Sequence, residues 1–427
     1  MKATCVRCLA ADARVKVCRV LSALLLTAIT VGFASQPLEV HAAGPSVVRF
    51  SAANYNVQEN LTFVTVTVLR TGDVSGPATV DYITAGVTAE QWNDYTFAQG
   101  TLRFAANETS KDIDMLISED IKIEGTETFT ITLSNGTGQA LLGSPATASI
   151  SILDDPVESG PNPINFVDIF VGQHYHDFLA RQSDSAGETF WENQIFNCNS
   201  NAACIDERRV NVSAAFFLSI EFQQSGYFVV RAHKAAFGNN KAVPRYFQFL
   251  NDQRRVIDGV VVGVGNWAAV LDANRQAFLE EFVSRPEFIS NFPQGQAASV
   301  YVDNMFANEG VIPTVSERQA AITAYGSGNT VGRAAALKSV IESDTVFNFQ
   351  YNSAFVLMQY FGYLRRDADD PPDNNFAGYD FWLTKMDQFS LPGENLRDER
   401  VALNRAKRAD MVKSFIDSAE YRFRFGQ

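Results

Sequence analysis

The chain has few of the residues on which common enzyme classes depend. Only four of its 427 residues are histidines, and three of these, His174, His176 and His233, follow residue 42. The sequence contains no His-Glu-x-x-His pair, no Walker-type phosphate loop and no Gly-x-Ser-x-Gly nucleophile motif. Two residues apart on a helix, His174 and His176 would point to different faces and make a poor metal pair. We therefore expect a protein that is not an enzyme.

Cysteine is also scarce. Three of the five cysteines, Cys5, Cys8 and Cys18, lie within the first 42 residues. The other two, Cys198 and Cys204, lie six residues apart in a polar loop. This spacing predicts a local disulfide that forms in an oxidising compartment.

The sequence lacks a hydrophobic run of the roughly 20 residues that a membrane-spanning helix needs. The apolar run Val20–Ala34 follows five basic residues and precedes the small-residue segment Val40–Ala42, which is the layout of a secretory signal peptide. We predict that residues 1–42 are removed on export and that no integral membrane segment remains. The mature protein would be secreted or held at the surface of a bacterium, and an uncleaved N-terminal anchor is the alternative.

Positive charge is in the minority. Lys and Arg number 35 against 48 Asp and Glu, which gives a formal net charge of −13. Without residues 1–42, whose net charge is +3, the charge becomes −16. Because nucleic-acid phosphates are neutralised by Lys and Arg, we exclude nucleic acid as a partner. The acidity suits cation binding, although solubility explains it equally well.

Residues 43–155 have the pattern of an all-β domain. Apolar and polar residues alternate in Leu61–Val68, Phe129–Leu133 and Ala148–Ile152, and glycine and asparagine separate such runs. About seven short strands at this spacing predict a β-sandwich.

Eight acidic residues in this domain stand at the ends of the alternating runs. Because strand ends lie close together in an antiparallel sandwich, we expect these carboxylates to converge on one end of it. Gathered carboxylates repel one another unless a cation lies between them, and oxygen-only ligands suit Ca²⁺. The candidate calcium ligands are Glu59, Asp94, Glu119, Asp120, Glu124, Glu127, Asp154 and Asp155. The acidic loop at residues 367–373 is a separate candidate, although it lacks the spacing of an EF-hand.

The pattern changes after a Pro- and Gly-containing linker at residues 156–163. Aromatic and leucine residues then recur at three- and four-residue steps, which predicts amphipathic helices for residues 164–427. Tyr175–Trp191 and Tyr360–Trp382 share an order of residue types, so we expect helical modules that repeat and stack on one another.

The repeated residues have structural roles in this interpretation. We expect Asp184 and Asp369 to cap the helix that follows each of them. Ser219 and Ser418 are expected to cap helices in the same way. Two arginines, Arg181 and Arg366, are expected to form ion pairs with the repeated glutamates.

Several segments of residues 47–155 carry a family pattern: Val64–Gly72, Gly100–Phe104, Ile117–Phe129 and Ser149–Asp155. Together they resemble the Calx-beta family. The resemblance implies an immunoglobulin-like sandwich that binds Ca²⁺ at one end through the eight acids named above. Glu119, Thr126 and Pro156 stand where that family often has Asp or another acid. We expect one or two Ca²⁺ ions with a dissociation constant of about 10⁻⁴–10⁻³ M, and a sandwich that has lost calcium is the alternative.

The helical part resembles a second family. Tyr175, Phe178-Leu179, Arg181, Asp184 and Phe190-Trp191, with their echoes at Tyr360–Trp382, are similar to the bacterial helical family called Domain of Unknown Function 4214. That family accompanies exported, repeat-rich surface proteins, and membership implies no particular activity.

The sequence thus predicts a multidomain chain, an all-β immunoglobulin-like sandwich followed by an all-α repeat region. We expect an exported, calcium-binding modular protein with a structural, adhesion or cell-surface role, whose helical region contacts an extracellular protein or glycan. Two alternatives stay open. One is a carbohydrate-active enzyme that uses acids such as Glu221 and Glu287, and the other is a glycan-binding protein that uses Trp191, Trp267 or Trp382.

Overall fold

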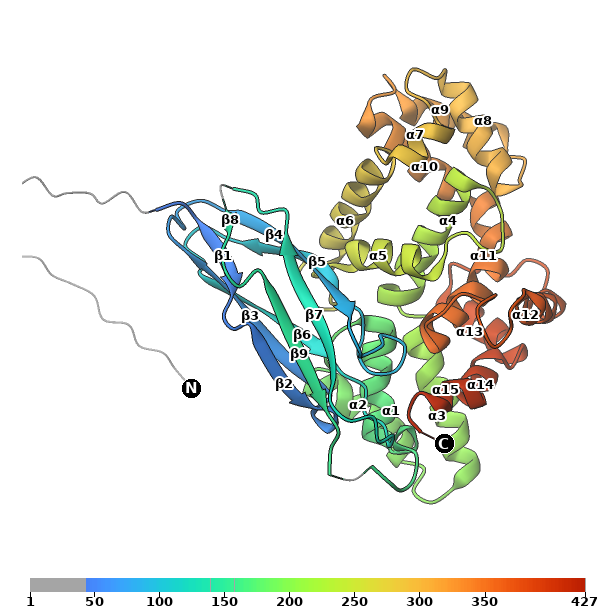
Figure 1. The fold of residues 1–427 in the computed structure, drawn as a ribbon. Coiled ribbons are helices and arrows are strands. Elements are labelled where there is room, and N and C mark those ends of the chain that lie inside the picture. The colour runs from blue at the N-terminus through green and yellow to red at the C-terminus, as the bar shows by residue number, and fades with distance from the viewer. Residues whose placement is uncertain (1–43, 139, 157, 427) are drawn as a thin grey trace, which may run out of the picture. The chain divides into compact units, whose positions relative to one another are not determined.

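The computed structural model describes residues 44–426 except Gln139 and Val157. The signal peptide predicted for residues 1–42 lies outside the described residues. In Figure 1 strands occupy the blue-to-teal part of the chain and helices the green-to-red part, in the order that the sequence predicts. Residues 43–427 form one compact unit.

The N-terminal part is a β-sandwich. Its strands, as far as the chain is described, are β1 (Val47–Phe50), β2 (Asn54–Gln58), β3 (Phe63–Thr71), β4 (Ala78–Gly86), β5 (Gln99–Phe104), β6 (Ser110–Leu116), β7 (Glu127–Ser134), β8 (Leu141–Leu142) and β9 (Thr147–Leu153). One sheet has the order β6-β3-β1-β8 and the other the order β2-β9-β7-β4-β5. Alternate side chains such as Val48, Val66 and Ile131 are fully buried in the core, as the period-two pattern predicts.

The strand register brings several of the predicted acids to one end of the sandwich. β2 pairs with β9 in parallel, with Gln58 opposite Leu153. The residues that follow, Glu59 and Asp154, therefore leave their strands at the same end. Glu127 begins β7 opposite Ile152 of β9, so it starts at that end as well.

The C-terminal part is helical. Its α-helices are α1 (Val167–His174), α2 (Ser185–Phe196), α3 (Ala202–Phe217), α4 (Ser225–Phe237), α5 (Tyr246–Ile257), α6 (Trp267–Phe282), α7 (Pro286–Asn291), α8 (Ala298–Glu309), α9 (Val315–Tyr325), α10 (Thr330–Ile341), α11 (Asp344–Gln359), α12 (Ala377–Gln388), α13 (Glu399–Arg408), α14 (Met411–Ile416) and α15 (Ala419–Phe423). The π-helical turns are η3 (Tyr175–Leu179), η4 (Ile220–Gln224) and η5 (Tyr360–Leu364), and the short 3₁₀ turns are η1 (Glu59–Leu61) and η2 (Pro163–Asn165). None of the described helices is both long and apolar enough to cross a bilayer.

Cys198, in the turn after α2, forms a disulfide with Cys204 in the first turn of α3, and their Cα atoms lie 5.5 Å apart. The bridge closes a short loop at the start of α3. It therefore ties two neighbouring helices together locally, without linking distant parts of the chain.

Two segments of the helical part make matching ion pairs. Arg181 Nε lies 3.3 Å from Glu221 Oε2, and Arg366 Nη2 donates to Glu420 Oε2 at 2.9 Å. Each guanidinium also lies over the tyrosine that opens its π-helical turn. The predicted pairing of both arginines with glutamates is confirmed.

The predicted caps are confirmed at three positions and wrong at one. Asp184 accepts a hydrogen bond from the backbone of α2, and Ser219 and Ser418 cap η4 and α15. Asp369 does not cap α12. Its carboxylate instead accepts a hydrogen bond from Arg245 Nη1 at 2.6 Å, because the loop before α12 is longer and includes two prolines.

The segment predicted as a linker is packed at its end. Asn162 is buried, and its Nδ2 donates to Arg422 O at 2.9 Å and to Gly426 O at 2.7 Å. The start of the helical part and its last turn are therefore joined by hydrogen bonds.

Candidate metal site at one end of the sandwich

Carboxylates from the β2–β3, β4–β5 and β6–β7 loops and from the chain after β9 converge at the end of the sandwich where β2, β6 and β9 finish. Glu59, Asp120 and Glu158 each offer an oxygen, and these oxygens lie within 4.8 Å of one another. Asp94, Asp120 and Glu124 form a second group within the same limit. Asp120 belongs to both groups and lies between the two candidate cation positions.

The backbone holds Asp94 against the loop that carries Asp120. Tyr95 forms an isolated β-bridge with Ile117, and Ser118 N donates to Asp94 O at 2.9 Å. The Tyr95 ring stacks on Phe129 in the core, with 4.0 Å between ring centroids. The β4–β5 loop is therefore pinned beside the β6–β7 loop, and ligands from distant sequence positions meet.

The carboxylates raise one another's pKa values. Burial, followed by the charges of Asp120 and Glu158, raises the pKa of Glu59. Burial is also the main cause that raises the pKa of Glu119 and of Glu124, each to about 7. Without a cation these groups carry a cost of desolvation and repulsion, which protonation or a metal ion relieves.

Three site oxygens are buried without a hydrogen-bond partner, namely Asp94 Oδ1, Glu119 Oε2 and Glu158 Oε2. Buried polar atoms of this kind are rare in folded proteins because each is costly. The donor set consists of oxygens alone, and such a set fits Ca²⁺, which takes six to eight oxygen ligands. The side chains present therefore suit one or two calcium ions.

One positive side chain lies at the rim of the site. Lys122 Nζ is 3.4 Å from Asp120 Oδ2, and Lys122 N donates to Asp120 Oδ1 at 2.6 Å. The ammonium group partly offsets the negative charge of Asp120 from one side.

The remaining predicted ligands lie around the two groups but outside them. Asp154 Oδ2 accepts a hydrogen bond from Gly125 N at 2.9 Å, and Asp155 Oδ2 accepts one from Asn60 Nδ2 at 2.9 Å. Burial and the adjacent Asp94 carboxylate raise the pKa of Glu127. Glu119 is near enough to Asp155 for that charge to raise its pKa.

Sequence reasoning missed one member of the site. Glu158 lies in the segment predicted as a linker, yet its Oε1 accepts a hydrogen bond from Asp155 N at 2.7 Å. This bond turns the chain back toward Glu59. An acid three residues after a closing Asp-Asp pair is the signal that would have included it.

The acidic side chains of residues 367–373 form ion pairs with arginines, and these pairs take the place of a second cation site. Arg245 lies 3.0 Å from Asp367, 2.6 Å from Asp369 and 3.4 Å from Asp370. The last acid of this loop pairs with Arg366 at 2.7 Å. Ion pairing therefore explains this acidic cluster.

The side chains considered for the glycan and enzyme alternatives lie on several different helical elements. Glu221 is buried, paired with Arg181, and accepts a hydrogen bond from Val262 N, whereas Glu287 is exposed. Trp191, Trp267 and Trp382 are partly buried against the helical core.

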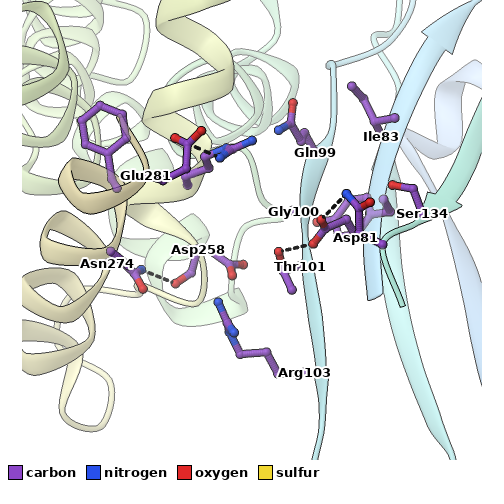
Figure 2. A pocket seen from close by; sticks show the side chains of 15 residues that line it. Asp81, Ile83, Gln99, Gly100, Thr101, Arg103, Ser134, Asp258, Asn274 and Glu281 are labelled. Carbon is purple, nitrogen blue, oxygen red and sulfur yellow. Dashed lines mark hydrogen bonds and ion pairs between the residues drawn. The ribbon is translucent and has the colours of Figure 1, made fainter. Parts of the chain in front are cut away.

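A polar cleft of about 370 Å³ separates β4 and β5 from α5 and α6. Figure 2 shows Asp81, Thr101 and Arg103 on its strand side and Asp258 and Glu281 on its helix side. Burial raises the pKa of Asp258, and the Arg103 charge opposes that rise. The cleft combines charges of both signs.

Comparison with known proteins assigns the sandwich to a family. Residues 41–156 match the family model of the Calx-beta domain. Sodium/calcium exchanger 1 of Mus musculus is 35% identical over 128 residues, which cover 26% of this chain and 13% of the exchanger. Adhesion G-protein coupled receptor V1 of Danio rerio is 31% identical over 107 residues, which cover 25% of this chain and 2% of the receptor.

Among solved structures, the crystal structure of the apo-form Calx CBD1 domain is 31% identical, with a TM-score of 0.26. That alignment covers 26% of this chain and 99% of the Calx domain. The chain spans only a small part of the length of its curated relatives.

Proposed function

Starting from the Calx-beta domain of residues 41–156, we propose that this protein is a non-enzymatic modular protein whose sandwich binds Ca²⁺. The ions would lie between Glu59, Asp120 and Glu158 and between Asp94, Asp120 and Glu124. The observation that carries the proposal is Asp120, which joins two groups of carboxylate oxygens at the end of the sandwich. Exchangers with calcium in their name have a related domain, which supports the same ion.

We further propose that the helical part is a repeat region related to Domain of Unknown Function 4214. Support comes from the matching arginine–glutamate pairs at Arg181 and Arg366. A repeat region of this kind would contact an extracellular protein or glycan, and the protein would act in structure or adhesion at a bacterial surface after export. The basic and apolar segment before residue 42 supports export.

Calorimetry tests calcium binding directly. The protein, freed of calcium with a chelator, is titrated with CaCl₂, and its thermal unfolding is followed with and without the ion. A ligand that binds only the folded state at 100 times its dissociation constant raises the free energy of unfolding by about 2.7 kcal/mol. Absence of both binding heat and a melting shift at several millimolar CaCl₂ would contradict the proposal.

Glycan binding is the second candidate function. It is favoured by the cleft of Figure 2, whose carboxylates, amides and guanidinium groups can bond sugar hydroxyls. A glycan array with the whole chain tests it, with the double variant Arg103→Ala and Asp258→Asn as control. Signals that persist in the double variant would assign any glycan binding to another surface.

A further inference from the structure

The loop that carries Asp94 is held on both sides by one arginine of the helical part. Arg365 Nη1 donates to Gln91 O at 2.9 Å and to Tyr95 O at 3.2 Å. Arg365 Nη2 donates to Thr96 Oγ1 at 2.9 Å. The acceptors are backbone carbonyls and a hydroxyl, so Arg365 does not pair with the carboxylate of Asp94. Oδ2 of Asp94 accepts a hydrogen bond from Glu90 N at 2.6 Å, and Oδ1 is left for a cation.

A second anchor of the same loop is Trp92. Its Nε1 donates to Leu364 O at 2.9 Å, and its carbonyl accepts a hydrogen bond from Arg424 Nε at 3.1 Å. The Trp92 ring lies 6.5 Å from the ring of Phe423. Five hydrogen bonds therefore join this loop to the residues at the ends of η5 and α15.

The two arginines are fixed by one buried carboxylate. Asp177 Oδ1 lies 2.6 Å from Arg365 Nη2 and 2.9 Å from Arg424 Nη2. Asp177 and Arg424 have no exposed side-chain area, and that of Arg365 is 4%. Burial alone would raise the pKa of Asp177. The charges of Arg424 and Arg365 outweigh that effect and hold this pKa far below its usual range. Each guanidinium is thus charged and held in one orientation.

The second ligand loop, between β6 and β7, touches the same end of the helical part. Lys122 Nζ donates to Arg424 O at 3.3 Å and lies 5.3 Å from the centre of the Phe423 ring. The backbone of Gly426, at φ +105°, approaches Ile121 so closely that an added Cβ would lie 2.3 Å from Ile121 Cγ1. The loop that carries Asp120 and Glu124 therefore rests on the last turn of the helical part.

We propose that Arg365 and Arg424 are positioning residues for the calcium site, so that docking of the helical part sets the calcium affinity of the sandwich. They hold the Asp94 loop in the conformation that brings Asp94 to Asp120. A loop that is already ordered loses less entropy when it binds an ion. Because binding free energies are linked reciprocally, calcium in turn strengthens the docking of the helices. The inference rests on the proposed calcium function.

The test compares two conservative variants of the whole chain. Arg365→Lys keeps the positive charge beside Asp177 but loses the fork that reaches three loop acceptors. Arg405→Lys is the matched control. Arg405 is also buried, and three of its nitrogens donate hydrogen bonds to Glu394 and Asn352, both within the helical part. Calcium affinity is measured by calorimetry, and hydrogen exchange of the backbone amides of residues 90–97 is measured with and without the ion.

We expect Arg365→Lys to weaken calcium binding about fivefold or more, which is the lower range of coupling between sites, and to speed amide exchange in residues 90–97. Arg405→Lys is expected to lower the melting temperature without changing the calcium dissociation constant. Equal calcium affinity of wild type and Arg365→Lys would overturn the inference, whereas absence of binding by wild type would overturn the proposed function itself.

If Arg365→Lys fails to fold, Trp92→Phe and Thr96→Val serve in its place. Each removes one hydrogen bond across the interface from the sandwich side and leaves the pairs of Asp177 intact. The expected result is a weaker calcium affinity in both variants together with faster exchange of the loop. Wild-type affinity in both would again overturn the inference.

Discussion

The carboxylates of Glu59 and Glu158 have oxygens within 4.8 Å of each other at the rim of the sandwich. Burial and the neighbouring acids raise the pKa of Glu59, because two anions at this separation repel each other where water is partly excluded. A proton or a cation at this pair would therefore relieve the repulsion. The choice between these two depends on calcium concentration and pH.

Replacing Glu158 with Gln tests its membership of the site. The change removes one charge and keeps the shape, so we expect the calcium dissociation constant to rise about tenfold or more, since even outer-shell changes cost 10–100-fold in metal affinity. Calorimetric titration measures this dissociation constant. Glu108→Gln is the control, because Glu108 pairs with Lys111 elsewhere on the sandwich. Equal affinities of Glu158→Gln and wild type would remove Glu158 from the site.

Replacing Asp120 with Asn should have opposite effects on stability with and without calcium. Burial raises the pKa of Asp120, so a neutral amide relieves repulsion and raises the melting temperature of the calcium-free protein. With millimolar CaCl₂ the variant should melt below wild type, because it loses a ligand common to both groups. Asp114→Asn, an exposed change on β6, should affect neither comparison. A variant that melts below wild type in both conditions would contradict this account.

The contribution of Glu119 and Glu124 to the stability of the calcium-free protein should fall as pH rises from 4.5 to about 7. The folded-state pKa values of Glu119 and Glu124 are raised to about 7, mainly by burial. A carboxyl group with a raised folded pKa contributes stability that is complete below its unfolded value and is lost as pH rises through the folded value.

Calcium binding near pH 7 should release protons for the same reason, because the ligands must be deprotonated. Calorimetry in buffers of different ionisation enthalpy measures this release, and thermal unfolding measures the pH trend. Binding heats that do not depend on the buffer would show that the carboxylates are already ionised.

Acid should weaken the helical part through a buried histidine. Burial lowers the pKa of His174 to about 4, and its ring bonds Phe170 O and Ser213 Oγ. Below pH 6.5 the unfolded chain binds a proton that the folded chain does not, so stability falls until about pH 4. The loss would reach about 3 kcal/mol for a shift of this size.

The variant His174→Gln isolates this effect. It should be less stable than wild type at pH 7.5, where the ring makes two hydrogen bonds, and the difference should shrink as pH falls below 6.5. Denaturant unfolding at several pH values gives the free energies of unfolding of wild type and of His174→Gln. A difference that stays constant between pH 7.5 and 5 would exclude His174 as the source.

The sequence predicted the sandwich, the helical part and the end at which the acids meet, because alternation and strand ends are local properties. Asp94 and Asp120 could be named because each follows a strand pattern. Glu158 could not, because only the hydrogen bond from its carboxylate to Asp155 N returns the chain to the site. That turn depends on packing after the last strand, which periodicity does not describe.

Contacts between the two parts of the chain were beyond the sequence patterns. Arg365 follows a helix and looks like the neighbouring Arg366, yet Arg366 pairs with Glu420 inside the helical part and Arg365 reaches the sandwich. Asp369 was predicted as a cap because of its spacing, and the position of Arg245 decides its role instead. Tertiary partners of charged residues depend on the packing of distant elements.

Asn162 joins the first and last turns of the helical part through Arg422 O and Gly426 O. A unit whose entry and exit lie together can be moved into a surface loop of another protein without stretching its host. With residue 162 beside residue 426, the geometry of the helical part is compatible with insertion into a surface loop of another protein.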